Sequence, residues 1–327
     1  MKILITGGGG FLGSRLARTL LARGTLGGKP IASITLLDGA FPSSLKELDK
    51  GKVRAVTGDV SDADAIARVC APGTDAVFHL AAVVSGAAEA DFDLGMRVNL
   101  QGMELLLAQM RRIGTGGANP PRLVYTSSVA AFGGDLPEVL DDATIANPQT
   151  SYGAQKVIGE YLVTDYTRKG YIDGRSLRLP TIVVRAGKPN AAASSFASGV
   201  IREPLNGAVS ECPVAPETGV WLLSPGRVVD AFIHAWELPP EAWGARRWLN
   251  LPGITASVAQ MVEAMRKVVG DAAAKRVLYK PDARIQAIVK TWPVNFHTPR
   301  ALAMGFKPDH DVEGVIRAYI ADEGIKI

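Results

Sequence analysis

The chain of 327 residues, 47% of them hydrophobic, is long enough for one large domain or for one domain with a smaller companion. Its net charge of +4 comes from scattered lysines and arginines, which argues against a nucleic-acid partner and favours an anionic small molecule. No stretch approaches the ~18 to 20 apolar residues of a membrane span and no signal-peptide pattern follows Met1, so we expect a cytoplasmic protein with no membrane partner.

The first 130 residues alternate short β-branched runs with helical patterns. In chain order we expect strands at residues 2–6, 34–38, 53–60, 75–82 and 122–128, and helices at about 12–23, 63–69 and 96–112. Helices between successive strands imply right-handed crossovers, so the sequence predicts an α/β fold with a doubly wound parallel Rossmann sheet. Ligands bind such sheets at the carboxyl ends of the strands.

The regular alternation weakens after about Leu177, where alanine- and proline-rich stretches separate the helices. We therefore predict a Rossmann domain over residues 1–180, with short returns at about 220–252, and a smaller, interleaved C-terminal substrate domain over 181–327. Glycine, asparagine and paired prolines also predict a loop at 113–121.

A glycine run, GGGGFLG, lies between the first predicted strand and the first predicted helix. It can be read as Gly8-x-Gly10-x-x-Gly13 or as Gly7-x-x-Gly10-x-x-Gly13. Backbone N–H groups at such a helix start bind pyrophosphate, and glycine allows the close approach that this requires. By itself, a glycine run can also form an ordinary tight turn.

Two aspartates follow later strands of the predicted sheet. Asp38 lies about 25 residues beyond Gly13, where it either accepts hydrogen bonds from the adenosine ribose or is a turn residue before Gly39. A carboxylate there repels a 2′-phosphate, and residues 39–45 contain no arginine to receive one, so NAD is favoured over NADP. Asp59 either caps the following helix or binds the adenine amino group.

The segment TSYGAQK places Tyr152 four residues before Lys156, on one face of a predicted helix. A neighbouring ammonium lowers the pKa of a tyrosine and favours the phenolate, which can then remove a proton from a hydroxyl. The pattern is also common on solvated helices. Here it follows the strand RLVYTSS, whose Ser127 and Ser128 supply hydroxyls beside the expected cofactor.

Taken in this order, the motifs resemble the extended short-chain dehydrogenase/reductase family, also called the NAD-dependent epimerase/dehydratase family, over nearly the whole chain. The motifs that carry the resemblance are TGGGGFLG, LLDGA, GDV, FHLAA, VNLQG, VYTSSVAAFG, PQTSYGAQK and, more loosely, LRLPTIV. The resemblance implies an NAD site formed by Gly7, Gly10, Phe11, Leu12, Gly13, Asp38, Asp59, Val60, Leu80, Ala81, Ala82, Asn99, Tyr152, Lys156 and Pro180.

The resemblance also implies the catalytic roles. Tyr152 would be the acid/base, Lys156 would bind the nicotinamide ribose and lower the pKa of the tyrosine, and Ser128 would orient the substrate oxygen. Asn99 corresponds to the family's helix asparagine or is only a structural hydrogen-bonder. A homodimer is implied through a four-helix interface made by the helices that contain Asn99 and Tyr152.

The expected substrate follows from the segment LRLPTIVVRAG, which we interpret as an apolar strand ending on an arginine. Thr181 stands where nucleotide-sugar enzymes of the family commonly have asparagine. Arg185 either grips a substrate carboxylate or forms a structural ion pair. Ser85, expected in the loop AAVVSGAAEAD, is a further substrate contact. With the alanine-rich insert at 186–199, the pattern resembles the sugar-acid-oxidising branch of the family.

We therefore expect an NAD-dependent dehydrogenase that oxidises a secondary hydroxyl of a tetronate such as D-erythronate. The first alternative is a nucleotide-diphosphate-sugar 4-epimerase that keeps its NAD tightly bound, and the second is a noncatalytic dinucleotide sensor. We expect no metal, because no histidine or cysteine pair has metal-ligand spacing. His79, Cys70 and Cys212 are interpreted as packed, inert residues.

Overall fold

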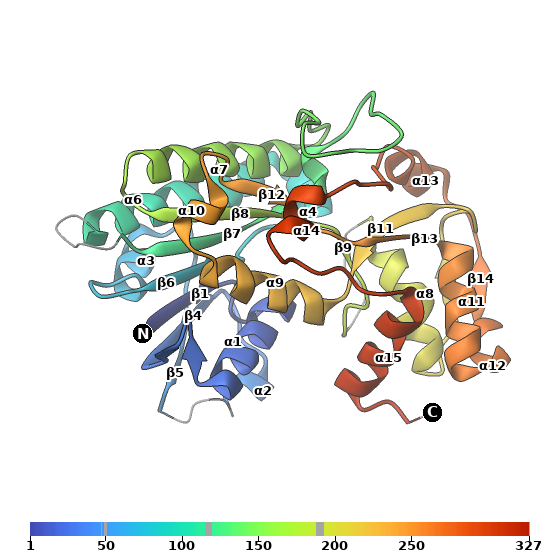
Figure 1. Ribbon diagram of the computed structural model, residues 1–327. Coiled ribbons are helices and arrows are strands. Elements are labelled where there is room, and N and C mark those ends of the chain that lie inside the picture. Colours follow the sequence, from blue (N-terminus) through green and yellow to red (C-terminus); the bar gives the residue numbers. More distant parts are fainter. Residues whose placement is uncertain (47, 49–50, 115–119, 188–192, 327) are drawn as a thin grey trace. The chain divides into compact units, whose positions relative to one another are not determined.

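The computed structural model describes the chain at residues 1–46, 48, 51–114, 120–187 and 193–326 (Figure 1). The expected loop at 113–121 and the insert at 186–199 lie partly outside the described residues. The chain divides into two compact units, here called the first and the second unit. The first unit comprises Met1–Ser128, Thr150–Arg178 and Val229–Leu249, and the second comprises Val129–Gln149, Leu179–Val228 and Asn250–Ile327.

The first unit is built on a sheet of seven strands in the order β12-β8-β7-β6-β1-β4-β5. The strands are β1 (Lys2–Thr6), β4 (Ser33–Asp38), β5 (Val53–Thr57), β6 (Ala76–His79), β7 (Arg122–Ser128), β8 (Asp173–Leu179) and β12 (Trp248–Asn250). From β5 to β7, neighbouring strands pair in parallel. The predicted doubly wound Rossmann sheet is confirmed.

Helices cover both faces of this sheet. They include α1 (Phe11–Arg23), α3 (Ala63–Val69), α4 (Ser85–Ala90), α5 (Phe92–Gly95), the π-helix η1 (Met96–Gln101), α6 (Gly102–Gly114) and α7 (Ser151–Arg168). Figure 1 shows α3, α6 and α7 on one face of the sheet and α1 on the other. The predicted helix over 96–112 therefore begins as a π-helix, and Ser85, expected in a loop, is the first residue of α4. Six residues are too few for a helical period to be recognised in the sequence.

The apolar run at 177–187 is not one strand. Strand β8 ends at Leu179, and β9 (Thr181–Ile182) pairs with β11 (Gly219–Leu223) in a separate sheet, in the order β13-β11-β9. Pro180 has no N–H to donate and restricts the residue before it, so the ladder stops there. Arg185 consequently lies three residues beyond a two-residue strand, and not at the end of a long one.

The second unit packs helices against its two small sheets. These elements include α8 (Ser195–Leu205), β10 (Ser210–Cys212), α11 (Val258–Val269), α12 (Asp271–Ala274), β13 (Ile254–Ser257), β14 (Val277–Tyr279), α13 (Ala283–Val289), α14 (Pro299–Ala303) and α15 (Val312–Glu323). Residues 129–149, predicted to belong to the Rossmann domain, group with the second unit, where Phe132 and Leu140 contact Phe296. Within the described ranges, no helix is long and apolar enough to cross a membrane.

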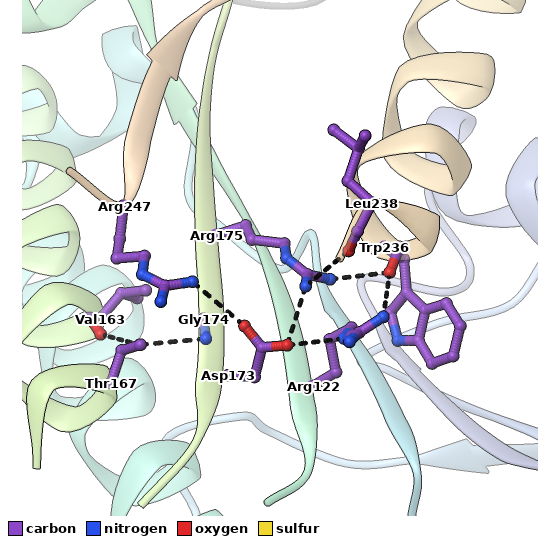
Figure 2. Close-up of polar contacts among 9 residues, drawn as sticks. All are labelled: Arg122, Val163, Thr167, Asp173, Gly174, Arg175, Trp236, Leu238 and Arg247. Carbon is purple, nitrogen blue, oxygen red and sulfur yellow. Dashed lines mark hydrogen bonds and ion pairs between the residues drawn. The ribbon is translucent and has the colours of Figure 1, made fainter. Parts of the chain in front are cut away.

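Three arginines surround one carboxylate at the amino ends of β7 and β8 (Figure 2). Asp173 Oδ2 accepts from Arg122 Nε and Arg175 Nη2, both at 2.8 Å, and Arg247 Nη1 lies 3.3 Å from Asp173 Oδ1. The side chain of Arg175 is fully buried, and burial lowers its pKa to about 9 while Asp173 acts in the opposite direction. We call these four residues the Asp173 cluster.

The Asp173 cluster also holds the carboxyl end of helix α9 (Pro225–Glu237). Arg122 Nη1 and Arg175 Nη1 donate to the Trp236 carbonyl at 2.6 and 2.8 Å, and Arg175 Nη2 donates to the Leu238 carbonyl at 3.0 Å. Cations are favourable at a helix carboxyl end, where backbone carbonyls lack helical partners. The cluster therefore stabilises the first unit at the end of β7 opposite Ser128.

Replacing Asp173 should destabilise the protein. In the Asp173→Asn variant three guanidinium groups lose their shared counter-charge, and we expect the free energy of unfolding to fall by about 3–5 kcal/mol. Asp165→Asn is the matched control, because its ion pair with Arg168 is exposed and should contribute less than about 1 kcal/mol. Urea denaturation measures both variants, and equal losses would contradict the clamping role of Asp173.

Candidate active site

The glycine loop is too tightly packed for side chains. A Cβ atom at Gly13 would lie 2.1 Å from the Gly7 carbonyl oxygen, and one at Gly7 would lie 2.7 Å from the Ala81 nitrogen. Gly7 also has a φ of +71°, which side-chain-bearing residues rarely adopt. Gly10 caps α1 with no side chain to cover the helix end, whose backbone N–H groups suit a phosphate. The loop therefore fits the pyrophosphate of a dinucleotide.

A cavity of about 640 Å³ opens at the carboxyl ends of β1, β4, β5 and β6. It is lined by Gly7, Gly10, Leu37, Asp38, Gly39, Thr57, Gly58, Asp59, Val60, Leu80, Ala81, Ala82, Val83 and Val98. Eight of the residues expected to bind NAD lie in this wall. The other lining residues were not singled out from the sequence. Leu37, Gly39, Gly58 and Val98 lie within recognised motifs, and Thr57 and Val83 directly precede or follow one.

The two aspartates occupy different parts of this wall. Asp38 Oδ2 accepts from the Gly9 backbone N–H at 3.0 Å, which fixes the carboxylate beside the glycine loop. Asp59 accepts from the backbone N–H and the hydroxyl of Ser61, and these hydrogen bonds lower its pKa. The N-cap of α3 is Asp62 and not Asp59, so the helix-capping alternative for Asp59 is wrong.

Asn99 braces the cavity wall from η1. Its Oδ1 accepts from the Val83 N–H at 2.7 Å, and its Nδ2 donates to the Val83 carbonyl at 3.1 Å and to Gln155 Oε1 at 2.7 Å. Asn99 is buried and does not line the cavity. These bonds tie the loop after β6 to helix α7 and match the structural alternative for this residue.

Helix α7 carries Tyr152 in its first turn and Lys156 one turn later. The N-cap, Thr150, accepts from the Gly153 N–H at 3.1 Å, so the helix start is well defined. Tyr152 is half-buried, and Lys156 Nζ lies 5.4 Å from the centre of its ring. A positive charge at this separation favours the phenolate over the neutral phenol.

Lys156 is almost fully buried against strand β7. Its Nζ donates to the Thr126 carbonyl at 2.8 Å and lies 4.9 Å from the centre of the Tyr125 ring. Burial lowers the pKa of Lys156 to about 7, and the charge of Glu160 acts in the opposite direction. Helix α7 packs on β7, and the last residue of that strand is Ser128, which is half-buried. The contact between α7 and β7 therefore also positions Ser128.

The residues interpreted as inert are packed in the interior. The His79 ring stacks on Tyr125, its Nδ1 lies 2.7 Å from Thr6 Oγ1, and burial lowers its pKa to about 3. Cys70 and Cys212 are buried free thiols, and burial raises the pKa of Cys70 to about 12. Neither thiol is activated as a nucleophile.

Three of the expected site residues, Pro180, Thr181 and Arg185, belong to the second unit. Arg185 is half-buried beside the start of α8, where its backbone N–H donates to Ser198 Oγ at 3.0 Å. Its Nη2 lies 3.5 Å from Ser194 Oγ, at the N-cap of that helix. A guanidinium and a helix start at one place favour an anion.

Comparison with known proteins agrees with this geometry. Residues 3–236 match the model of the NAD dependent epimerase/dehydratase family. The chain is 55% identical to a D-erythronate dehydrogenase of Cupriavidus necator over 99% of both chains. It is 42% identical to a D-erythronate dehydrogenase of Haemophilus influenzae over 98% of this chain and 99% of the relative.

A solved structure described as a nucleoside-diphosphate-sugar epimerase from Agrobacterium tumefaciens is 40% identical. It aligns with a TM-score of 0.92 over 100% of this chain and 95% of its own. The resemblance inferred from the motifs is thereby confirmed, and so are NAD as cofactor and oxidoreductase chemistry on CH–OH groups. The chain belongs to the NAD-dependent epimerase/dehydratase family.

Proposed function

We propose that the protein is a dehydrogenase that oxidises D-erythronate to 2-dehydro-D-erythronate with NAD. The observation that carries the choice of substrate is the 55% identity, over nearly the full length of both chains, to a D-erythronate dehydrogenase. The buried Lys156 beside Tyr152 supports the reaction type, because this pair suits removal of a hydroxyl proton.

In the proposed reaction Tyr152 takes the proton of the substrate hydroxyl. The Lys156 ammonium stabilises the phenolate, and the Ser128 hydroxyl orients the reacting oxygen. NAD, when bound, would supply the acceptor for the hydride that leaves the substrate carbon. Apart from Asn99, all residues expected to bind NAD keep that role as proposals, both the eight in the cavity wall and those outside it, such as Phe11, Leu12 and Pro180.

For the substrate carboxylate we propose Arg185, with Ser85 and Thr181 as further contacts. The Arg185→Lys variant loses the planar fork that grips both carboxylate oxygens, so KM for the sugar acid should rise about tenfold or more. KM for NAD should change less than about twofold, because the proposed contact is with the acid alone. Steady-state kinetics with each substrate varied in turn measures both, and equal effects would return Arg185 to a structural role.

A substrate screen tests the function. Four-carbon sugar acids and UDP-sugars are incubated with NAD while NADH absorbance is followed, and D-erythronate should give the fastest reduction. An epimerase would instead act on a UDP-sugar, keep stoichiometric NAD and release no net NADH. A dinucleotide sensor would bind NAD and turn over no substrate in the screen.

We further propose a cytoplasmic homodimer, formed through α7 and the helix that contains Asn99. Exposed apolar side chains on α5 and α7 support self-association, since Phe92, Ile158 and Tyr161 have exposed fractions of 59%, 41% and 67%. Sedimentation equilibrium distinguishes a dimer from a monomer.

A further inference from the structure

Glu160 is a buried carboxylate one helical turn beyond Lys156 on α7. It is 1% exposed, and Lys156 is 2% exposed. Residues four apart on a helix share a face, so Tyr152, Lys156 and Glu160 form one row. Glu160 belongs to none of the motifs recognised in the sequence.

Two partners hold the Glu160 carboxylate. Arg178 of β8 donates through Nε to Oε1 at 2.8 Å and through Nη2 to Oε2 at 2.6 Å. The Arg178 guanidinium lies over the Trp248 ring, 4.0 Å from its centre. Two hydrogen bonds from a planar guanidinium, which itself stacks on an aromatic ring, fix the orientation of the carboxylate. The third contact, from Ser127 Oγ to Glu160 Oε1, reaches the end of β7.

The contact with Ser127 is one of the hydrogen bonds that connect α7 to the carboxyl-terminal half of β7. Lys156 Nζ donates to the Thr126 carbonyl, and the next residue, Ser127, donates its hydroxyl to Glu160. Thr126 Oγ1 also donates to the His79 carbonyl at 3.1 Å. The strand is therefore anchored at both positions that directly precede Ser128.

The charges around Lys156 give Glu160 a second effect. The titratable groups facing Lys156 are Tyr152 and Glu160 on α7, Tyr125 on β7 and His79 on β6, and Arg178 of β8 lies beyond Glu160. His79 is buried with a low pKa and is neutral near pH 7. Glu160 is therefore the anion that faces two buried cations.

We propose that Glu160 is a positioning residue of the active site. Its carboxylate, held by Arg178, anchors Ser127 next to Ser128 and is the buried counter-charge of Lys156. This inference rests on the proposed function, because it acts through the roles assigned to Ser128, Tyr152 and Lys156. Glu160 itself touches neither substrate nor cofactor in this role.

The test is the pH dependence of kcat in the Glu160→Gln variant. Loss of the anion lowers the pKa of Lys156, so the ammonium deprotonates at lower pH. We expect the alkaline limb of the kcat profile to move down by about one pH unit and kcat at pH 8 to fall about tenfold. KM for NAD should change less than about twofold. Asp165→Asn, an exposed carboxylate on the same helix, should leave the profile unchanged.

Two further variants separate positioning from folding. Glu160→Asp keeps the charge, so the alkaline limb of the kcat profile should return most of the way to its wild-type position. The value of kcat should stay low, because Ser127 loses its contact. If Glu160→Gln folds poorly, the double variant Glu160→Gln with Arg178→Met removes both buried charges and should recover stability with the limb still displaced. Thermal melting and NAD titration by fluorescence monitor folding and cofactor binding in each variant.

A wild-type profile in Glu160→Gln, or in the double variant where it is needed, overturns the inference. Equal displacement in Glu160→Asp and Glu160→Gln overturns it as well, since a carboxylate would then have no special effect. The substrate screen with the wild-type enzyme and the Tyr152→Phe variant, assayed in parallel, report on the proposed function and on the role of Tyr152 by themselves. A wild type that reduces NAD with no sugar acid refutes that function, and an active Tyr152→Phe enzyme refutes the role of Tyr152. An active wild type and an inactive Tyr152→Phe enzyme, together with a normal Glu160→Gln profile, refute only the role of Glu160.

Discussion

Replacing Tyr152 with phenylalanine should lower kcat by about 10²–10⁴-fold and leave the affinity for NAD within about twofold of the wild type. The substitution removes only the hydroxyl that is proposed to take the substrate proton. The phenyl ring can still occupy its place near Lys156, whose Nζ lies 5.4 Å from the ring centre. NADH formation measures kcat, and a fluorescence titration measures the dissociation constant for NAD.

The matched control for this experiment is Tyr161→Phe. Tyr161 lies on the same helix, and 67% of it is exposed. Phenylalanine keeps the apolar ring that the proposed dimer contact uses, so loss of the hydroxyl should leave kcat unchanged. A Tyr152→Phe enzyme with normal kcat would rule out Tyr152 as the acid/base. Equal losses of kcat and of NAD affinity would instead indicate that the tyrosine mainly binds the cofactor.

Much of the first unit could be predicted because local patterns decide it. The strands at 2–6 and 122–128 have the predicted bounds, and the glycine loop could be placed because a Cβ at Gly13 would clash with Gly7, six residues earlier. These features depend on residues close together in the sequence. Their physical causes, periodicity and steric exclusion, are therefore visible in the sequence.

What escaped prediction depends on contacts between distant segments. Glu160 meets Arg178 and Ser127 across 18 and 33 residues, and Asp173 meets Arg247 across 74 residues. A single buried charge leaves no periodic pattern in the sequence, so its partner can be identified only in the folded structure. The break at Pro180 is different, because the proline that causes it is visible in the sequence. The apolar run around Pro180 nevertheless led to the prediction of one continuous strand.

The Lys156→Met variant should lose activity and gain stability. For activity, Lys156 Nζ lies 5.4 Å from the centre of the Tyr152 ring. A charge at about this distance contributes about 3 kcal/mol at an effective dielectric constant near 20, so kcat should fall about 10²-fold. For stability, methionine fills a similar space without the cost of burying an ammonium, and we expect a higher free energy of unfolding near pH 7.

The pH dependence of this gain in stability tests the lowered pKa of Lys156. The pKa of Lys156 is about 7 in the folded protein, against ~10.4 for an unperturbed lysine. Between these values the unfolded chain binds one proton more than the folded protein, so the wild type gains stability as the pH rises, whereas the variant lacks this contribution. The advantage of Lys156→Met should be largest at or below pH 7 and shrink by about 1.4 kcal/mol per unit between pH 7 and 9. Urea denaturation across this range measures it, and a constant difference would show that Lys156 keeps an ordinary pKa in the folded protein.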